Sequence, residues 1–240
     1  MKVIKWSGYE WASQERWGNI NMEKPYCHYD QSAMNVDGYG YLHLTTFRNP
    51  KLFRSNNNGR LSNIESPIGI GLASCKTMFG YGYFEIEAKL PTGKNLWPAF
   101  WLWSEKGWPP EIDVFEGYTN KKGDYFKPQF NLGWYNLNTN LHFKDVKNGK
   151  NKQAKAKTHF LGFKDPSKHF IKYGLKFTEN EITIFYNNKQ VRKWTDPNIL
   201  QYFRGHKMNV VINNSVTEDV NVLEENYSDF VIKYFKYQSL

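Results

Sequence analysis

The chain has 240 residues, of which 40% are hydrophobic and 23% charged, and its formal net charge is +9. This composition fits a globular protein and excludes a disordered tail. No apolar stretch approaches the roughly 20 residues needed to cross a bilayer, so we expect no membrane span and no membrane partner. The N-terminal segment MKVIKWSGYEW lacks the apolar region of a secretory signal, so we expect no signal peptide in this sequence.

Helical periodicity is almost absent, and short β-rich runs alternate with Gly, Asn, Asp and Pro. Turn signals such as Asp37-Gly38 and Asn187-Asn188 separate these runs, and Glu179-Asn180 predicts a tight hairpin. In chain order, the predicted strands are 40–47, 82–90, 99–104, 111–116, 129–134, 140–143, 171–177, 181–186, 208–213 and 230–237. No internal repeat or linker is evident. We therefore expect one all-β domain over residues 1–240, with two stacked antiparallel sheets and an exposed concave face.

The positive charge is concentrated in one segment. Lys144–Lys157 holds six Lys and one Asp, which supplies +5 of the +9. This stretch could form a rim that attracts a sulfated or carboxylated polysaccharide, but charge runs are usually solvated, mobile loops, and we favour that reading. Aromatic residues make up 18% of the chain, which would suit base stacking. No basic residues are interleaved with the aromatic cluster, so we expect no nucleic-acid partner.

The most informative segment is WPPEIDVFEGY, which contains three acids in an otherwise apolar stretch. In a strand, Glu111 and Asp113 share a face because side chains alternate with period two. Plain alternation would turn Glu116 to the buried face, whereas one extra residue in a β-bulge would bring it back beside the other two. Crowded carboxylates push pKa values apart, so that one acid stays ionised while another keeps its proton.

This pair of protonation states is what glycoside hydrolysis with retention of configuration requires. Two other interpretations of the acids stay open, a solvated acidic strand and a calcium site. An exposed edge would not carry Ile112, Val114 and Phe115 between its acids, and a calcium loop would be richer in Gly and Asn. We expect that no cofactor or metal is required, although a structural calcium ion is possible.

The segment GYFEIEAKLPTGKNLWPAFWLWSEKGWPPEIDVFE closely resembles glycoside hydrolase family 16. The similarity extends along most of the chain, through NTNLHF and KMNVVINNSV to DFVIKYFKYQ, and is loose over the first 70 or so residues. The spacing E-x-D-x-x-E resembles the bulged form of the family motif, found in its laminarinase, agarase and carrageenase branches. The resemblance implies a concanavalin-like β-jelly-roll sandwich with a concave substrate cleft.

By resemblance, Glu111 would be the nucleophile, Glu116 the general acid and base, and Asp113 the residue between them that positions the nucleophile. The implied activity is that of a retaining endo-β-glycosidase. Its substrate would have internal β-1,3- or β-1,4-linkages, in a glucan or galactan that could be sulfated. A non-catalytic lectin on the same scaffold and a transglycosylase are the alternatives. The substrate class implies a secreted or cell-surface protein, and we expect a monomer whose partner is the polysaccharide or oligosaccharide substrate.

Sugar-binding residues are expected beside the acids, because flat aromatic rings stack on the apolar faces of pyranoses. Trp97 and Trp101 share one strand face, and Trp108 begins the acidic segment; each could equally be a core residue. We favour Trp97 and Trp108 as the stacking pair. His142 shares a face with Asn140 and could bind a sugar or Asp113, although a lone His on a strand is more often structural.

The two cysteines, Cys27 and Cys75, are too far apart in sequence for a C-x-x-C site, and no clustered His suggests zinc. A disulfide between them and two unpaired structural thiols are both compatible with the sequence.

Overall fold

The computed structural model describes residues 1–16, 27–57, 60–119, 123, 125–129, 132–145, 149–154, 156–160, 164–217 and 228–240. Its elements are β1 (Val3–Trp6), β2 (Tyr9–Ala12), β3 (Cys27–Tyr29), β4 (Met34–Val36), β5 (Leu42–Asn57), β6 (Arg60–Phe79), β7 (Gly82–Lys89), β8 (Leu96–Ser104), β9 (Glu111–Gly117), β10 (Phe126–Gln129), β11 (Leu132–Lys144), β12 (Asn151–Gln153), β13 (Ala156–Phe160), β14 (Ile171–Phe177), β15 (Ile182–Tyr186), β16 (Lys189–Trp194), α1 (Pro197–Leu200), β17 (Met208–Val216) and β18 (Ser228–Ser239). A single 3₁₀ turn, Gln31–Ala33, precedes β4. The prediction of an all-β fold is confirmed.

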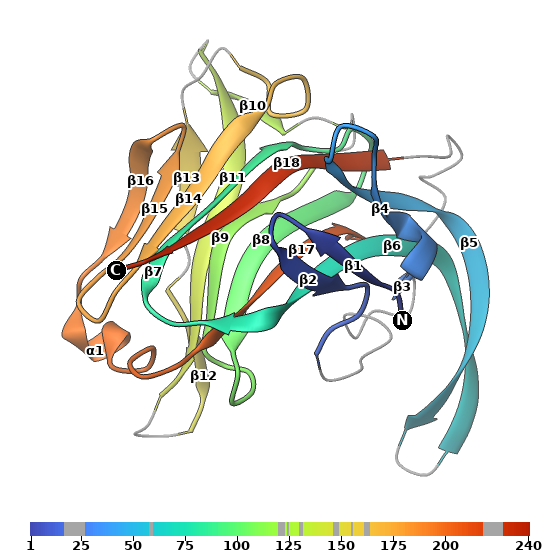
Figure 1. The fold of residues 1–240 in the computed structure, drawn as a ribbon, viewed down its shortest axis with the longest axis horizontal. Helices are drawn as coiled ribbons and strands as arrows, with labels where there is room; N and C mark the ends of the chain where they lie inside the picture. Colours follow the sequence, from blue (N-terminus) through green and yellow to red (C-terminus); the bar gives the residue numbers. More distant parts are fainter. Residues whose placement is uncertain are drawn as a thin grey trace.

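The strands form two layers that face each other (Figure 1). One, here called the cleft layer, has the order β1–β2–β6–β17–β8–β9–β11, with β10, β12 and β13 also paired to β11. The other, here called the back layer, has the order β4–β5–β18–β7–β14–β15–β16. The long β6 pairs with β5 near its start and with β17 near its end, so it joins the layers. Pairing is antiparallel except for β3, which runs parallel to β6.

The core fills the space between the layers. Phe115 of β9 packs on Tyr173 of β14 with 4.5 Å between ring centroids, and neither side chain is exposed to solvent. Tyr186 of β15 donates its hydroxyl hydrogen to the backbone oxygen of Val114 at 3.0 Å. Contacts of this kind bury apolar area and, through the hydrogen bond, satisfy a phenol that would otherwise be costly to bury. They hold β9 firmly against the back layer.

Most predicted strands are confirmed, some as parts of longer ones. The prediction of one strand over residues 129–134 is wrong, because Gln129 ends β10 and Leu132 begins β11, and these two residues pair with each other across a hairpin. The second predicted strand in this region, over residues 140–143, is the last part of β11. The turn at Asn187-Asn188 is confirmed; φ angles of 48° and 64° give the left-handed conformation that a tight hairpin between β15 and β16 requires.

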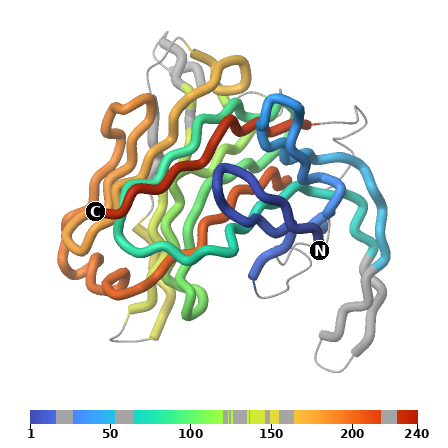
Figure 2. Tube along the Cα trace, viewed as in Figure 1, coloured from blue at the N-terminus to red at the C-terminus, as the bar shows by residue number. Residues whose placement is uncertain are grey.

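The N-terminal hairpin β1–β2 lies at the edge of the cleft layer, beside β6 (Figure 2). Cys27 and Cys75 are both buried and no disulfide joins them. No helix among the described residues has the length and apolar character needed to span a bilayer.

Candidate active site

The three acids lie on one face of β9 because the strand contains the predicted bulge. Asp113 and Glu116 are three positions apart in β9, whereas their partners in β8 are only two positions apart. The strand β9 therefore contains one extra residue at this point. The same irregularity occurs on the other side, against β11. Val114 and Phe115, which lie between the two acids, both point into the core and are fully buried. The bulge therefore turns Glu116 to the same side as Glu111 and Asp113.

These acids line a cavity of about 260 Å³ on the outer face of the cleft layer. The Glu111 side chain is 14% exposed and that of Asp113 only 5%. Of the residues predicted to bind sugar, four also line this cavity: Trp97, Trp101, Asn140 and His142. The structure thus brings residues of β8, β9 and β11 together around one hollow.

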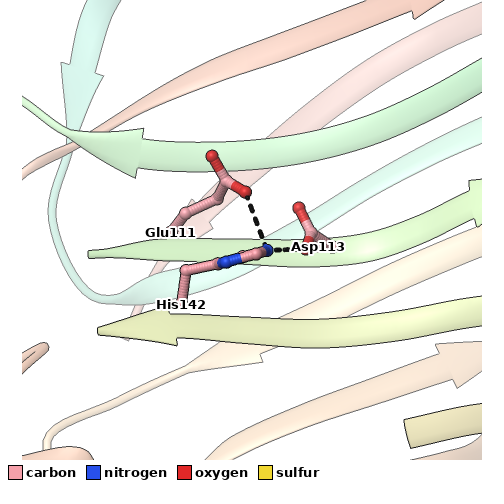
Figure 3. Close-up of side chains that lie close together, drawn as sticks. All are labelled: Glu111, Asp113 and His142. Atoms are coloured by element: carbon pink, nitrogen blue, oxygen red, sulfur yellow. Dashed lines mark ion pairs between the residues drawn. The ribbon is translucent and has the colours of Figure 1, made fainter. Parts of the chain in front are cut away.

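The His142 side chain lies close to two of the three acids. Its Nε2 lies 3.3 Å from Oε1 of Glu111 and 3.3 Å from Oδ2 of Asp113, as the dashed lines in Figure 3 show. The Nδ2 atom of Asn140 lies 3.0 Å from the same Nε2. The imidazole therefore lies beside Asp113, one of the two partners expected for it, and also beside Glu111. One side chain from β11 thus approaches both carboxyl groups.

Burial controls the protonation of this cluster. It raises the pKa of Glu111 well above its ordinary value, and the charge of Asp113 raises it further, whereas the nearby His142 lowers it. Burial and the charge of Glu116 likewise raise the pKa of Asp113. Because both pKa values are raised, Glu111 and Asp113 keep their protons to a higher pH than exposed carboxyls do.

Tyr118 is a site residue that the sequence analysis did not identify. Its hydroxyl donates a hydrogen bond to Oε1 of Glu116 at 2.7 Å, and its ring stacks on Trp97 with centroids 5.5 Å apart and an interplanar angle of 23°. The sequence does contain a signal for it: Tyr118 is two residues after Glu116, and the period-two alternation of a strand places both side chains on the same face.

The predicted stacking pair of Trp97 and Trp108 does not form one platform. Trp97 lies near Glu116 and Tyr118, whereas Trp108 lies at the other end of the acid row, with its ring centroid 5.7 Å from that of His142. Trp108 is 47% exposed and is not among the residues that line the cavity. The two rings therefore flank the acids from opposite ends, and their binding to sugar stays a prediction.

Trp101 forms part of the cavity wall, and a hydrogen bond to a buried residue anchors its indole ring. Its Nε1 donates to Oδ1 of the buried Asn213 at 2.8 Å, which fixes the orientation of the indole. A buried indole N–H needs such a partner. Trp101 is only 8% exposed, so it has both a packing role and a surface in the cavity.

Part of the lysine-rich segment 144–157 lines the cavity, although its composition favoured a solvated loop. Residues 146–148 and 155 lie outside the described residues, but Asn151–Gln153 forms the short strand β12, paired with β11 so that Gln153 lies opposite His142. Gln153 lines the cavity, and Lys152 forms an ion pair with Asp145 at 2.6 Å. Residues 151–153 are thus a paired strand at the rim, and the expectation of a loop is wrong for these three residues.

The cluster also has the composition of a cation site. Glu111, Asp113 and His142 each offer one ligand atom, and these atoms lie within 4.8 Å of one another. Carboxylate and imidazole ligands of this kind could hold a divalent cation. The same three groups can equally exchange a proton without a metal, because two of them are carboxyls with raised pKa values.

The curated relatives match short parts of the chain. The endo-1,3-1,4-β-glycanase ExsH of Rhizobium meliloti is 57% identical over 37 residues, which are 15% of this chain and 8% of that protein. Xyloglucan endotransglucosylase/hydrolase protein 3 of Arabidopsis thaliana is 31% identical over 129 residues, 53% of this chain and 39% of that protein. The matches thus span less than half the length of these relatives.

Solved structures share the fold over most of both chains. LamAcat of Zobellia galactanivorans superposes with a TM-score of 0.69 at 17% identity, over 89% of this chain and 84% of the other. The κ-carrageenase of Pseudoalteromonas carrageenovora, in complex with an oligotetrasaccharide of κ-carrageenan, gives 0.67 at 19% identity, over 88% and 84%. The family described as glycosyl hydrolases family 16 matches residues 29–227. Since this match covers most of the sequence, the chain belongs to family 16 of the glycosyl hydrolases.

Proposed function

We propose that the chain is a retaining endo-β-glycosidase that cleaves internal β-1,3- or β-1,4-linkages of a polysaccharide by double displacement. The observation that carries this proposal is the bulge in β9, which directs Glu111, Asp113 and Glu116 into one cavity. Retention by double displacement uses a nucleophile and an acid/base about 5 Å apart that flank the scissile bond. Acids that share one strand face can lie this close. We also propose that residues 1–240 form one catalytic domain, since a single main core cluster connects both layers.

In the first step, a carboxylate oxygen of Glu111 attacks the anomeric carbon and forms the glycosyl–enzyme bond. The bond to the leaving sugar breaks, and Glu116 transfers its proton to the leaving oxygen. In the second step, Glu116 takes a proton from water, whose oxygen attacks the same carbon and releases Glu111. Configuration is retained because each step inverts it once.

Asp113 is proposed as the residue that keeps Glu111 ready to attack. When Asp113 is protonated and Glu111 is ionised, the O–H of Asp113 can donate to the carboxylate of Glu111. His142, 3.3 Å from both carboxylates, is proposed to orient them and to stabilise their negative charge. Both residues act through Glu111, whereas Trp97, Trp101, Trp108 and Asn140 are proposed to contact the sugar.

The substrate class is proposed from the activities for which the similar proteins are named. They include glucan endo-1,3-β-glucosidases and a galactan endo-β-1,3-galactanase, so a β-linked glucan or galactan is the proposed class. The side chains of Lys144, Lys150 and Lys152 are exposed near the rim, where they would attract sulfate groups. The proposed class therefore includes sulfated polysaccharides. A polymeric substrate places the enzyme outside the cell or on its surface. We propose that it acts there as a monomer, without nucleic-acid or membrane partners.

Two alternatives each have one observation in their favour. A β-1,3-glucan-binding protein of Penaeus monodon is 40% identical over 72 residues, which favours a lectin. The similarity to a xyloglucan endotransglucosylase/hydrolase favours transfer to a second sugar in place of water. The three acids argue against the lectin, because sugar binding needs no nucleophile. Transfer and hydrolysis use the same intermediate and differ only in what attacks it.

The test is a panel of polysaccharides that includes laminarin, mixed-linkage glucan, agarose and κ-carrageenan, with release of reducing ends as the readout. We expect cleavage of at least one member, with oligosaccharides as products and with the β-anomer formed first by proton NMR. Glu111→Gln should abolish cleavage, and Glu179→Gln, at a site 62% exposed on the back layer, should not change it. Unchanged cleavage by Glu111→Gln, or initial release of the α-anomer, would rule the mechanism out.

A further inference from the structure

The outer surface of the back layer carries a set of lysines that the proposed mechanism does not use. Here it is called the basic face, and it is formed by β7, β14, β15, β16 and the last part of β18. The three acids lie on the outer side of the cleft layer, and the core lies between the layers (Figure 1). The basic face is therefore on the opposite side of the molecule from the cleft. Its lysines are Lys89, Lys172, Lys176, Lys193, Lys233 and Lys236.

Strand pairing explains why these side chains share one face. Lys176 pairs with Thr183, and Thr183 pairs with Lys193. Directly paired residues point to the same side of a sheet. Leu175, which is next to Lys176, is fully buried in the core, so this row of side chains points outward. Lys172 is four residues before Lys176 in the same strand and therefore has the same orientation.

The lysines of the basic face outnumber the acids beside them. Their carboxylate partners are Glu85, Glu87 and Glu181, and Glu181 forms ion pairs with both Lys176 and Lys193. Six lysines and three glutamates give this face +3 of the net charge of +9, in addition to the +5 of the segment 144–157. Positive charge is thus concentrated in two places on opposite sides of the molecule.

The charges on the basic face also form two levels. The side chains of the three glutamates are 3%, 20% and 16% exposed, whereas those of the lysines that bind them are 30–55% exposed. The carboxylates therefore lie close to the sheet, and the ammonium groups lie outside them. A ligand that approaches this face meets the positive charge first.

Aromatic rings lie between the lysines and are held in place. The hydroxyls of Tyr83 and Tyr234 each donate a hydrogen bond of 2.8 Å to Glu85, one to each carboxylate oxygen. The Tyr83 ring crosses the neighbouring strand at Gly174, where a Cβ would lie 3.0 Å from Cζ of the ring. Phe185 follows on the next strand, with its ring centroid 6.2 Å from that of Tyr83. All three rings are partly exposed, and fixed rings bind the apolar faces of pyranoses with little loss of conformational entropy.

The spacing of the lysines indicates which kind of polyanion fits this face. Lys172 and Lys176 are about 13 Å apart along β14, and Lys176 and Lys193 are about 10 Å apart, across two strand spacings. A nucleic-acid duplex carries one charge per ~1.7 Å of its axis, which is far denser. A polysaccharide with an acidic group on only some of its sugars has widely spaced charges and also offers ring faces to Tyr83 and Phe185. Among the described residues of this face, no large apolar side chain is exposed enough to insert into a membrane.

We infer that the basic face binds an acidic polysaccharide, with sulfate or carboxylate groups over the lysines and sugar rings over Tyr83 and Phe185. Binding here needs none of the three acids of the cleft, so the inference goes beyond the proposed function and can fail or hold separately from it. A polysaccharide bound on this side leaves the cleft free. The basic face would thus hold the protein on an acidic matrix while the cleft takes up a different chain segment.

The test uses two acidic polymers, dextran sulfate and polygalacturonate, with dextran as the uncharged reference. Their sugars are α-linked, so none of them is the β-linked substrate proposed for the cleft. Calorimetry compares the wild type with Lys172→Gln/Lys176→Gln/Lys193→Gln. Because three charge contacts are lost, we expect Kd for at least one acidic polymer to rise about tenfold, and the polymer with the larger loss identifies the acidic group. Dextran should bind neither protein measurably.

The matched control is Lys5→Gln/Lys76→Gln/Lys207→Gln, which removes the same charge from exposed lysines away from the basic face. It should raise Kd by less than about twofold, because salt screens charges at this distance. Equal Kd values for the wild type and the basic-face variant, an equal loss in the control, or no binding of either acidic polymer would overturn the inference. The melting temperatures show that the variants compared are folded.

Phe185→Ala tests the contact with sugar rings. It should weaken binding of the acidic polysaccharide and leave binding of inorganic polyphosphate, which has no sugar rings, unchanged. Equal effects on the two ligands would overturn the assignment to a polysaccharide. Tighter binding of polyphosphate or of phosphatidylserine vesicles than of either polysaccharide, lost in the basic-face variant, would also overturn it, because the face would then attract any polyanion.

Discussion

The hydroxyl of Tyr118 donates a hydrogen bond to Oε1 of Glu116 at 2.7 Å, while the ring of Tyr118 stacks on Trp97. Burial and the charge of Glu116 raise the pKa of Tyr118, so its phenol keeps the hydrogen that it donates. The side chain therefore combines a contact to the proposed acid/base with a flat surface at the cavity wall. The bond therefore restricts the orientation of the Glu116 carboxyl.

Tyr118→Phe removes the donor and keeps the ring. Because Glu116 must be protonated in the first step, this bond joins two neutral groups and contributes about 0.5–1.5 kcal/mol, so we expect kcat to fall roughly 2- to 10-fold. KM should change little because the ring can still stack on Trp97. Steady-state kinetics on the cleaved polysaccharide measures both values. Tyr39→Phe, at a tyrosine 87% exposed, is the control; a large rise in KM with unchanged kcat in Tyr118→Phe would mean that Tyr118 only binds sugar.

The raised pKa of Glu111 sets the acidic limit of activity. Its ordinary value is 4.5, and the group must be ionised to attack, so activity should be lost as the pH falls through a value above 4.5. Asp113→Asn removes a neighbouring charge that raises this pKa. We expect the acidic limb of kcat/KM to move to lower pH, together with a lower maximum.

The measurement is a pH profile of kcat/KM for the wild type and Asp113→Asn. Asp196→Asn is a suitable control, because Asp196 caps α1 and Asn is an equally good N-cap. Its profile should coincide with that of the wild type. If the acidic limb of the kcat/KM profile lies at the same pH in Asp113→Asn as in the wild type, the charge of Asp113 does not determine that pH.

Chelators test whether the Glu111–Asp113–His142 cluster works as a metal site. The proposed chemistry uses the three side chains without a metal, so activity should be unchanged after prolonged treatment with EDTA and dialysis. A cation held by these ligand atoms, which lie within 4.8 Å of one another, would neutralise the attacking carboxylate, so added Zn²⁺ should inhibit. Activity that EDTA removes and Ca²⁺ or Zn²⁺ restores would contradict the proposed mechanism.

The acid trio could be predicted from sequence because the period of a strand and one bulge determine which way each side chain points. Tyr118 follows from the same period and could have been predicted with them. Gln153 could not, because a lysine-rich composition gives no local signal for a strand; β12 exists through its pairing with β11.

The later half of β6 could not be predicted for a different reason. Glycines in a run usually indicate turns or weak strands, yet Gly71 lies inside this strand. A Cβ there would lie 2.6 Å from the backbone oxygen of Ala33 and 2.8 Å from Cα of Leu44. Glycine is required by the close approach of other backbone segments, which only the folded chain reveals. The strand that joins the two layers therefore has a sequence that resembles a loop.

Phe115 connects the stability of the fold with the position of Glu116. It is fully buried and contacts the ring of Phe100 in the neighbouring strand and the rings of Tyr173 and Phe230 across the core. Phe115→Ala should lower the free energy of unfolding by about 3–5 kcal/mol, through lost apolar burial and the cavity that remains. Urea denaturation followed by tryptophan fluorescence measures the change, with an unchanged m-value expected for two-state unfolding.

Because Phe115 is one of the two bulge residues that point inward, its loss should also loosen the side chain next to it. We expect kcat of Phe115→Ala to fall at temperatures where the variant is fully folded. Phe185→Ala serves as the comparison, since Phe185 is a partly exposed residue of β15 in the back layer. It should be less destabilising and leave kcat unchanged. Wild-type kcat in folded Phe115→Ala would show that packing behind the bulge does not position Glu116, and that the pairing of β9 with β8 and β11 is sufficient.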